Sequence, residues 1–121
     1  SYTSSSKSKK VAYKKSKAKK IKLDGQTSNI YTTGEKTSRW YKISITSTKK
    51  KRILNLGKNT VSGGYKFTIY KNGKKKAIKT IKVTENANAK IAKMPKKKGT
   101  YYIRISKLTK KTNGTYEIGY Y

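Results

Sequence analysis

The chain has 121 residues, a length that suits one compact domain with a tail and argues against a multidomain enzyme. Its 33 Lys and Arg against 4 Asp and Glu give a net charge of +29, while 11 tyrosines supply burial area that disordered chains lack. It contains no His and no Cys, the side chains on which most proton-transfer, thiol and transition-metal sites depend, so we expect neither an enzyme nor a cofactor.

The first 20 residues are almost all Ser, Lys, Ala and Thr. This composition predicts a basic linker or arm over residues 1–20 and a folded domain over residues 21–121. No apolar run approaches the roughly 18 residues of a membrane span, and residues 1–10 contain no apolar signal region. These features fit a mature product, an excised piece or an intracellular protein.

Short alternating runs follow the arm, and no stretch of a dozen residues has the period of an amphipathic helix. In residues 40–45, Tyr41, Ile43 and Ile45 share one face, which predicts a half-buried strand. Residues 65–70 alternate in the same way. Shorter strands are predicted over residues 20–23, 29–32, 52–56 and 89–92.

Two Asn-Gly pairs predict turns. Asn72 and Gly73 follow residues 65–70 and predict a two-residue hairpin, because both residues accept positive φ, and the chain then returns through residues 77–83. Asn113 and Gly114 predict a turn between strands over residues 101–106 and 116–121.

The eight or nine strands and the turns between them predict an all-β fold, an antiparallel two-sheet β-sandwich preceded by the basic arm. Period-two alternation also predicts which side chains face the core. The expected core residues are Tyr41, Ile43, Phe67, Ile69, Tyr101, Ile103, Tyr116 and Ile118.

Four segments occur in an order and approximate spacing that match a known family: residues 40–43, 64–73, 99–105 and 114–118. Residues 21–121 therefore resemble the bacterial pre-peptidase C-terminal domain and its relatives in extracellular proteins of Gram-positive bacteria. The resemblance implies a jelly-roll-like β-sandwich appended to secreted enzymes or surface proteins, where it helps them fold, be exported or hold a polymeric target. It also implies an extracellular or cell-surface location.

Members of this family often carry acidic residues just before the aromatic pair of the first segment, and some of them bind calcium there. In this chain those positions are Thr37, Ser38 and Arg39, so Arg39 stands where a cation would sit. Calcium wants several oxygen ligands with net negative charge, and the four acids are scattered: Asp24, Glu35, Glu85 and Glu117. We expect no metal site.

The basic residues are 30 Lys and 3 Arg. Lys is a hydrated point charge that attracts anionic polymers without the bidentate geometry by which Arg reads bases. The expected partner is an anionic cell-wall polymer or acidic polysaccharide. The alternative is nucleic acid, bound without sequence specificity because the sequence contains no helix-turn-helix, zinc finger or RNP-type motif. A third interpretation is a structural domain whose charge only keeps it soluble.

If the alternation is correct, several aromatic rings face outward beside basic residues, and the last residue, Tyr121, is among them. Flat rings can stack on sugars or bases, and the neighbouring cations can hold acidic groups. The same pattern also fits cross-strand packing under Lys stems with no ligand. The candidate ligand-binding residues of this non-catalytic accessory or binding module are Trp40, Lys42, Lys66, Tyr70, Tyr102 and Arg104.

Overall fold

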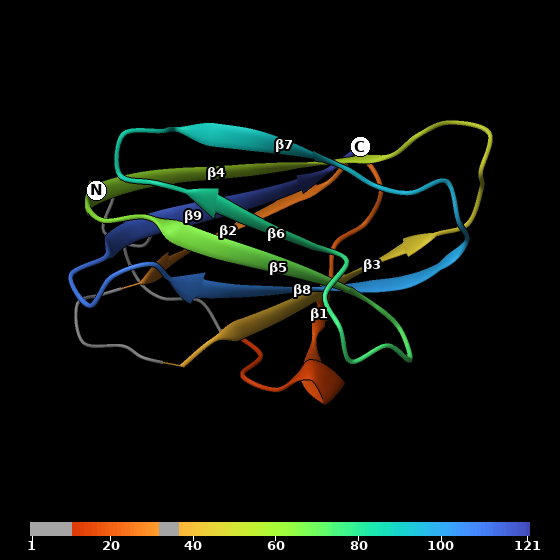
Figure 1. Ribbon diagram of the computed structural model, residues 1–121, viewed down its shortest axis with the longest axis horizontal. Helices are drawn as coiled ribbons and strands as arrows, with labels where there is room; N and C mark the ends of the chain where they lie inside the picture. The colour runs from red at the N-terminus through yellow and green to blue at the C-terminus, as the bar shows by residue number, and fades with distance from the viewer. Residues whose placement is uncertain (1–10, 32–36) are drawn as a thin grey trace.

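A computed structural model describes residues 11–31 and 37–121 (Figure 1). Residues 1–10 of the predicted arm, Thr32 of a predicted strand and Glu35 lie outside the described residues. In the described ranges the elements are the short 3-10 helix η2 (Lys15–Lys17) and the strands β1 (Lys19–Lys20), β2 (Gln26–Tyr31), β3 (Arg39–Ile45), β4 (Ile53–Ser62), β5 (Tyr65–Lys71), β6 (Lys79–Val83), β7 (Ala89–Lys93), β8 (Gly99–Lys107) and β9 (Asn113–Tyr120).

The strands form two sheets, one with the order β1-β3-β8-β5-β6 and one with the order β2-β9-β4-β7. The antiparallel pairs β2·β9, β3·β8, β4·β7 and β5·β6 are those of one long ribbon whose first half folds back on its second half. Rolling such a ribbon into two layers gives a jelly roll. The predicted β-sandwich is confirmed.

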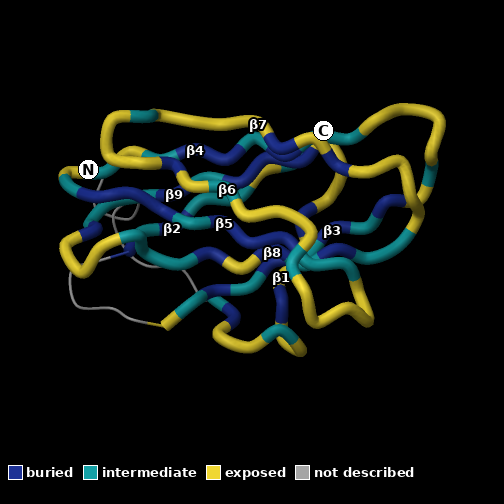
Figure 2. The backbone as a smooth tube through the Cα atoms, in the orientation of Figure 1, coloured by how far each residue is buried: buried dark blue, intermediate teal, exposed yellow. Residues whose placement is uncertain are grey.

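The core lies between the sheets and is built from every second residue of the strands. In β3, for example, buried and partly exposed residues alternate along its whole length (Figure 2). Burying each large side chain stabilises the fold by about 1.5–3 kcal/mol. All eight predicted core residues are buried: Tyr41, Ile43, Phe67, Ile69, Tyr101, Ile103, Tyr116 and Ile118.

The fold includes residues before Ile21, which the sequence assigned to the arm. β1 pairs in parallel with β3, and the backbone N–H of Trp40 donates to the carbonyl oxygen of Ala12 at 2.9 Å. Ala12 and Ala18 are buried. The second half of the predicted arm therefore lies along the edge of the five-stranded sheet. Over residues 11–31 and 37–121, no helix has the length and apolar character to span a bilayer.

The predicted two-residue hairpin at Asn72 and Gly73 is wrong, although a tight turn does begin there. The N–H of Lys74 donates to the carbonyl oxygen of Lys71 at 3.0 Å, and of the turn residues only Gly73 has a positive φ, of 81°. Pairing with β6 resumes at Ile69, so residues 72–78 form a longer loop. β5 extends beyond its pairing with β6, because its other edge remains paired with β8.

The predicted turn at Asn113 and Gly114 is also wrong, because both residues open strand β9. Gly114 pairs with Thr60 at a bulge in β4 and has a φ of 143°. A β-carbon at this position would lie 2.4 Å from the carbonyl oxygen of Asn59 and 2.5 Å from the α-carbon of Thr60. Glycine is needed here for the close approach of two strands, a contact made by residues distant in sequence.

Replacing Gly114 with Ala should lower the free energy of unfolding by about 2 kcal/mol or more, since the new methyl group meets backbone and φ is unfavourable. Gly73→Ala is the matched control, because φ is positive there but no atom lies within 4 Å of the added carbon. It should cost about 1 kcal/mol. Urea unfolding measures both, and equal costs would contradict the close approach at Gly114.

Candidate binding face

All six predicted ligand-binding residues lie on the outer face of the five-stranded sheet, on the adjacent strands β3, β8 and β5. The strand register pairs Trp40 with Arg104, and Tyr102 with both Lys42 and Tyr70. Lys66 pairs with Ser106, which lies two residues after Arg104 on β8. We call this set the cationic face: Trp40, Lys42, Lys66, Tyr70, Tyr102 and Arg104.

The aromatic rings of the cationic face pack across the strands. The ring centroids of Trp40 and Tyr70 are 5.7 Å apart with an interplanar angle of 36°. The guanidinium carbon of Arg104 lies 5.6 Å from the Trp40 centroid, and its Nε donates to the Ser38 hydroxyl at 2.9 Å. The rings are therefore half-buried. They pack across the strands, as one interpretation of the sequence expected, and cations lie beside them, as the other expected.

A seventh residue, Lys15 of η2, joins this face from the predicted arm. Its ammonium lies 4.9 Å from the centroid of the Tyr102 ring and 5.5 Å from that of Tyr70. A cation over a ring face is favourable by about 0.5–1 kcal/mol at exposed sites. The sequence contained no signal for this contact, because the Lys-rich arm has no periodicity that would orient one lysine.

Tyr121 was expected to face outward with the other rings, and its side chain is exposed. It belongs to the opposite side of the sandwich, however, since it follows β9 and its backbone N–H donates to Ile53 of β4. Tyr121 is therefore not part of the cationic face.

A shallow hollow of about 250 Å³ lies on the cationic face. Four hydroxyl side chains line it, those of Ser38, Thr68, Thr80 and Ser106, together with Lys66, Tyr70 and Arg104. Hydroxyl, ammonium and guanidinium groups donate hydrogen bonds, which the oxygens of a phosphate or carboxylate accept. The arrangement suits an anionic group.

Basic residues are distributed unequally between the two sheets. The strands of the four-stranded sheet contain three basic residues: Lys58, Lys90 and Lys93. The strands of the five-stranded sheet contain ten: Lys19, Lys20, Arg39, Lys42, Lys66, Lys71, Lys79, Lys82, Arg104 and Lys107. One side of the sandwich is therefore far more cationic than the other.

Arg39 is the exception within this cationic sheet, because its side chain is fully buried in the core. Its Nη1 donates to the carbonyl oxygen of Ile30 at 2.8 Å and contacts the Tyr116 hydroxyl at 3.4 Å. Its guanidinium carbon lies 3.8 Å from the centroid of the Tyr31 ring. Because side chains alternate along a strand, Arg39 lies on the same inner face as Tyr41. The sequence contains this alternation, but a charged residue is not normally expected in a core.

The phenols beside Arg39 are held in their neutral form. Burial raises the pKa of Tyr41, and the neighbouring Tyr116, whose hydroxyl lies 2.5 Å from that of Tyr41, raises it further. Burial also raises the pKa of Tyr116, against hydrogen bonds that lower it. Tyr116 therefore contacts Arg39 through its ring face and its hydroxyl oxygen rather than as a phenolate.

Arg39→Lys should lower the free energy of unfolding by about 1–3 kcal/mol, because an ammonium cannot reproduce planar stacking on Tyr31 together with the hydrogen bonds of a guanidinium. The same substitution at exposed Arg104 is the control and should change it by less than about 0.5 kcal/mol. Chemical denaturation followed by tyrosine fluorescence measures both. A loss at Arg39 no larger than that at Arg104 would rule out a structural role for the buried guanidinium.

Calcium should have no effect on stability. The resemblance seen in the sequence places Thr37, Ser38 and Arg39 at positions where members of that family often carry acids, and over the described ranges no three His, Cys, Asp or Glu side chains cluster as metal ligands. Thermal melts with a chelator and with added calcium are expected to coincide. A calcium-dependent rise of several degrees would show a metal site and contradict this expectation.

The fold is similar to that of the pre-peptidase C-terminal domain of a collagenase from Bacillus anthracis, with a TM-score of 0.70, 19% identity and coverage of 87% of this chain and 95% of that one. The resemblance seen in the sequence is thus confirmed at the level of fold.

Two other solved structures are less similar. The periplasmic inhibitor of g-type lysozyme from Aeromonas hydrophila has a TM-score of 0.53 at 11% identity, covering 87% of this chain and 98% of that one. The surface-associated copper-binding protein CorA of Methylomicrobium album has a TM-score of 0.56 at 9% identity, covering 86% and 98%. At these identities the likeness concerns architecture alone. No family model and no curated protein matches the sequence.

Proposed function

We propose that this protein is a non-catalytic extracellular accessory module that holds a secreted or surface protein to anionic polymers through the cationic face. The observation that carries the proposal is the convergence of Lys42, Lys66 and Arg104 with three aromatic rings on one sheet, joined by Lys15. The strands of the opposite sheet contain three basic residues, Lys58 on β4 and Lys90 and Lys93 on the edge strand β7.

Long-range electrostatics supplies most of the affinity. A net charge of +29 attracts polyanions from a distance, and each phosphate or carboxylate that a lysine neutralises releases a condensed counterion. Trp40, Tyr70 and Tyr102 add local contact with sugar rings or other flat groups. Lysine dominates the charge, so the module recognises charge density rather than a base sequence.

The extracellular assignment and the absence of catalysis rest on separate arguments. The fold is shared with a domain of a bacterial collagenase and with periplasmic and surface-associated proteins, which supports a location outside the cytoplasm. A sequence without His or Cys lacks the usual groups for general acid-base and nucleophilic catalysis, which supports a binding role. The polyanions met at such a location are phosphate-bearing wall polymers and acidic polysaccharides.

Affinity for a polyanion should fall by orders of magnitude between roughly 50 and 200 mM salt, as expected when several charges are neutralised together. Lys42→Gln combined with Lys66→Gln should weaken binding about tenfold and reduce the salt slope by about two. The matched control is Lys90→Gln with Lys93→Gln on β7 of the other sheet, where both lysines are exposed. It removes the same charge and should change affinity little.

Titration calorimetry at two salt concentrations, with teichoic acid, an acidic polysaccharide and duplex DNA, measures these effects. Trp40→Ala should cost a further few-fold without changing the salt slope. Equal losses from the two double variants would show that the cationic face is not a dedicated site. Equal affinity for all three polymers would show that the charge has no preferred partner.

A further inference from the structure

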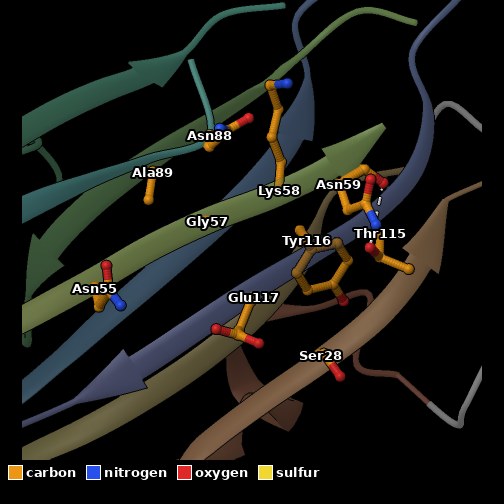
Figure 3. A pocket seen from close by; sticks show the side chains of 10 residues that line it. All are labelled: Ser28, Asn55, Gly57, Lys58, Asn59, Asn88, Ala89, Thr115, Tyr116 and Glu117. Carbon is orange, nitrogen blue, oxygen red and sulfur yellow. Dashed lines mark hydrogen bonds between the residues drawn. The ribbon is translucent and has the colours of Figure 1, made fainter. Parts of the chain in front are cut away.

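The outer face of the four-stranded sheet contains a second hollow, larger than that of the cationic face and different in chemistry. Its volume is about 360 Å³, at the lower end of the usual range for small-ligand pockets. Eight polar residues line it, from β2, β4, β9 and the position before β7: Ser28, Asn55, Lys58, Asn59, Asn88, Thr115, Tyr116 and Glu117 (Figure 3). We call it the neutral groove.

The side chains of the neutral groove carry hydroxyls, amides and two opposite charges, those of Glu117 and Lys58. The register places Ser28 and Gly57 on either side of Glu117, so these three positions share the outer face. Lys58 is adjacent in sequence to Gly57 and also lines the groove, although the register pairs it with the inward-facing Tyr116 (Figure 3). Its ammonium donates to the Thr60 hydroxyl at 3.2 Å and to the Glu85 carbonyl oxygen at 3.0 Å.

Gly57, at the floor of the groove, is a glycine that the fold itself does not require. It lies within the ten-residue strand β4, its pairing with Glu117 and Ala89 is regular, and its φ is not positive. An added β-carbon would lie 3.6 Å from the Asn88 carbonyl oxygen and 3.8 Å from the β-carbons of Ala89 and Glu117, which are ordinary contacts. Alanine would therefore fit.

The other strand glycines, Gly99, Gly114 and Gly119, differ from Gly57, and Gly99 has a positive φ of 143°. A β-carbon on Gly119 would lie 2.7 Å from the Tyr121 ring, and Gly114 has the close approach to Thr60 described above. Glycine inside a strand weakens the strand, and it commonly marks a place where a ligand or another backbone comes close. In the neutral groove the bare floor leaves room for such a ligand.

We infer that the neutral groove binds an uncharged, hydroxyl-rich ligand, a sugar unit of a glycan, seated on Gly57. An anion would meet the Glu117 carboxylate, and the one basic side chain that lines the groove, Lys58, already donates to Thr60 and to the Glu85 carbonyl oxygen. A cation would have to approach a protein of net charge +29 for one carboxylate. Sugar hydroxyls instead donate to Glu117 and both donate to and accept from the amides of Asn55 and Asn88.

The inference is tested by titrating isotope-labelled protein with cellotriose, maltotriose and triacetylchitotriose to about 10 mM and following backbone amide shifts, which detects dissociation constants in the millimolar range. At least one trisaccharide should shift amides in residues 55–59, 88–89 and 115–117. The shifts should not change between roughly 50 and 500 mM salt, since counterion release contributes nothing to a neutral ligand. Salt independence separates this site from the polyanion binding of the cationic face.

Two substitutions locate the site. Gly57→Ala fills the floor, so it should weaken binding at least tenfold while the melting temperature stays equal to or above that of the unmodified protein. Glu117→Gln keeps the shape and removes the acceptor charge, so it should weaken binding several-fold. Trp40→Ala, on the other sheet, is the control and should leave the titration unchanged.

Three outcomes would overturn the inference. One is the absence of shifts with every trisaccharide. Another is a set of shifts confined to the cationic face and abolished by Trp40→Ala. The third is a response to butylammonium chloride in place of the sugars, which would show that Glu117 recognises a cation. None of these outcomes bears on the salt-dependent binding of polyanions, which is measured on the opposite sheet.

Discussion

Packing between the inner faces of the two sheets holds this molecule together against the mutual repulsion of its cations, which follows from a net charge of +29. Tyrosine contributes much of that packing. The rings of Tyr31, Tyr65 and Tyr116 are in mutual contact, with centroids 5.6 to 5.9 Å apart. Tyr65 and Tyr120 donate to carbonyl oxygens at 2.6 and 2.8 Å, so each supplies a large apolar surface without leaving its hydroxyl unsatisfied.

The aromatic core also explains how the inner layer contains an arginine. Arg39 lies over the face of Tyr31 and donates to a backbone carbonyl, and two phenols with raised pKa values surround it in neutral form. A buried cation costs several kcal/mol unless ring faces and oxygen acceptors replace water. The segment in which we predict no calcium site contains Arg39. The guanidinium of Arg39 is a fixed cation on the inner face of the sheet.

Segregation of charge follows from the same two-layer construction. Each strand has one face in the core, so the function of the surface is decided by the outward register of each sheet. In β3, β5 and β8 that register carries lysine, arginine and aromatic rings, whereas in β2, β4 and β9 it carries amides, hydroxyls and Glu117. The two outer faces of one domain thereby differ in charge and in chemistry.

Alternation within single strands was enough to predict the β class, the eight core residues and the outward direction of Trp40, Tyr70 and Tyr102, because the side-chain period of a strand is a local property. The partners of each strand are not local. Only the tertiary structure decided that Gly114 closes against Thr60 instead of forming a turn, and that Lys15 reaches Tyr102. It also decided that β3, β8 and β5 are neighbours in one sheet, because these contacts join residues far apart in a chain whose strands have similar patterns.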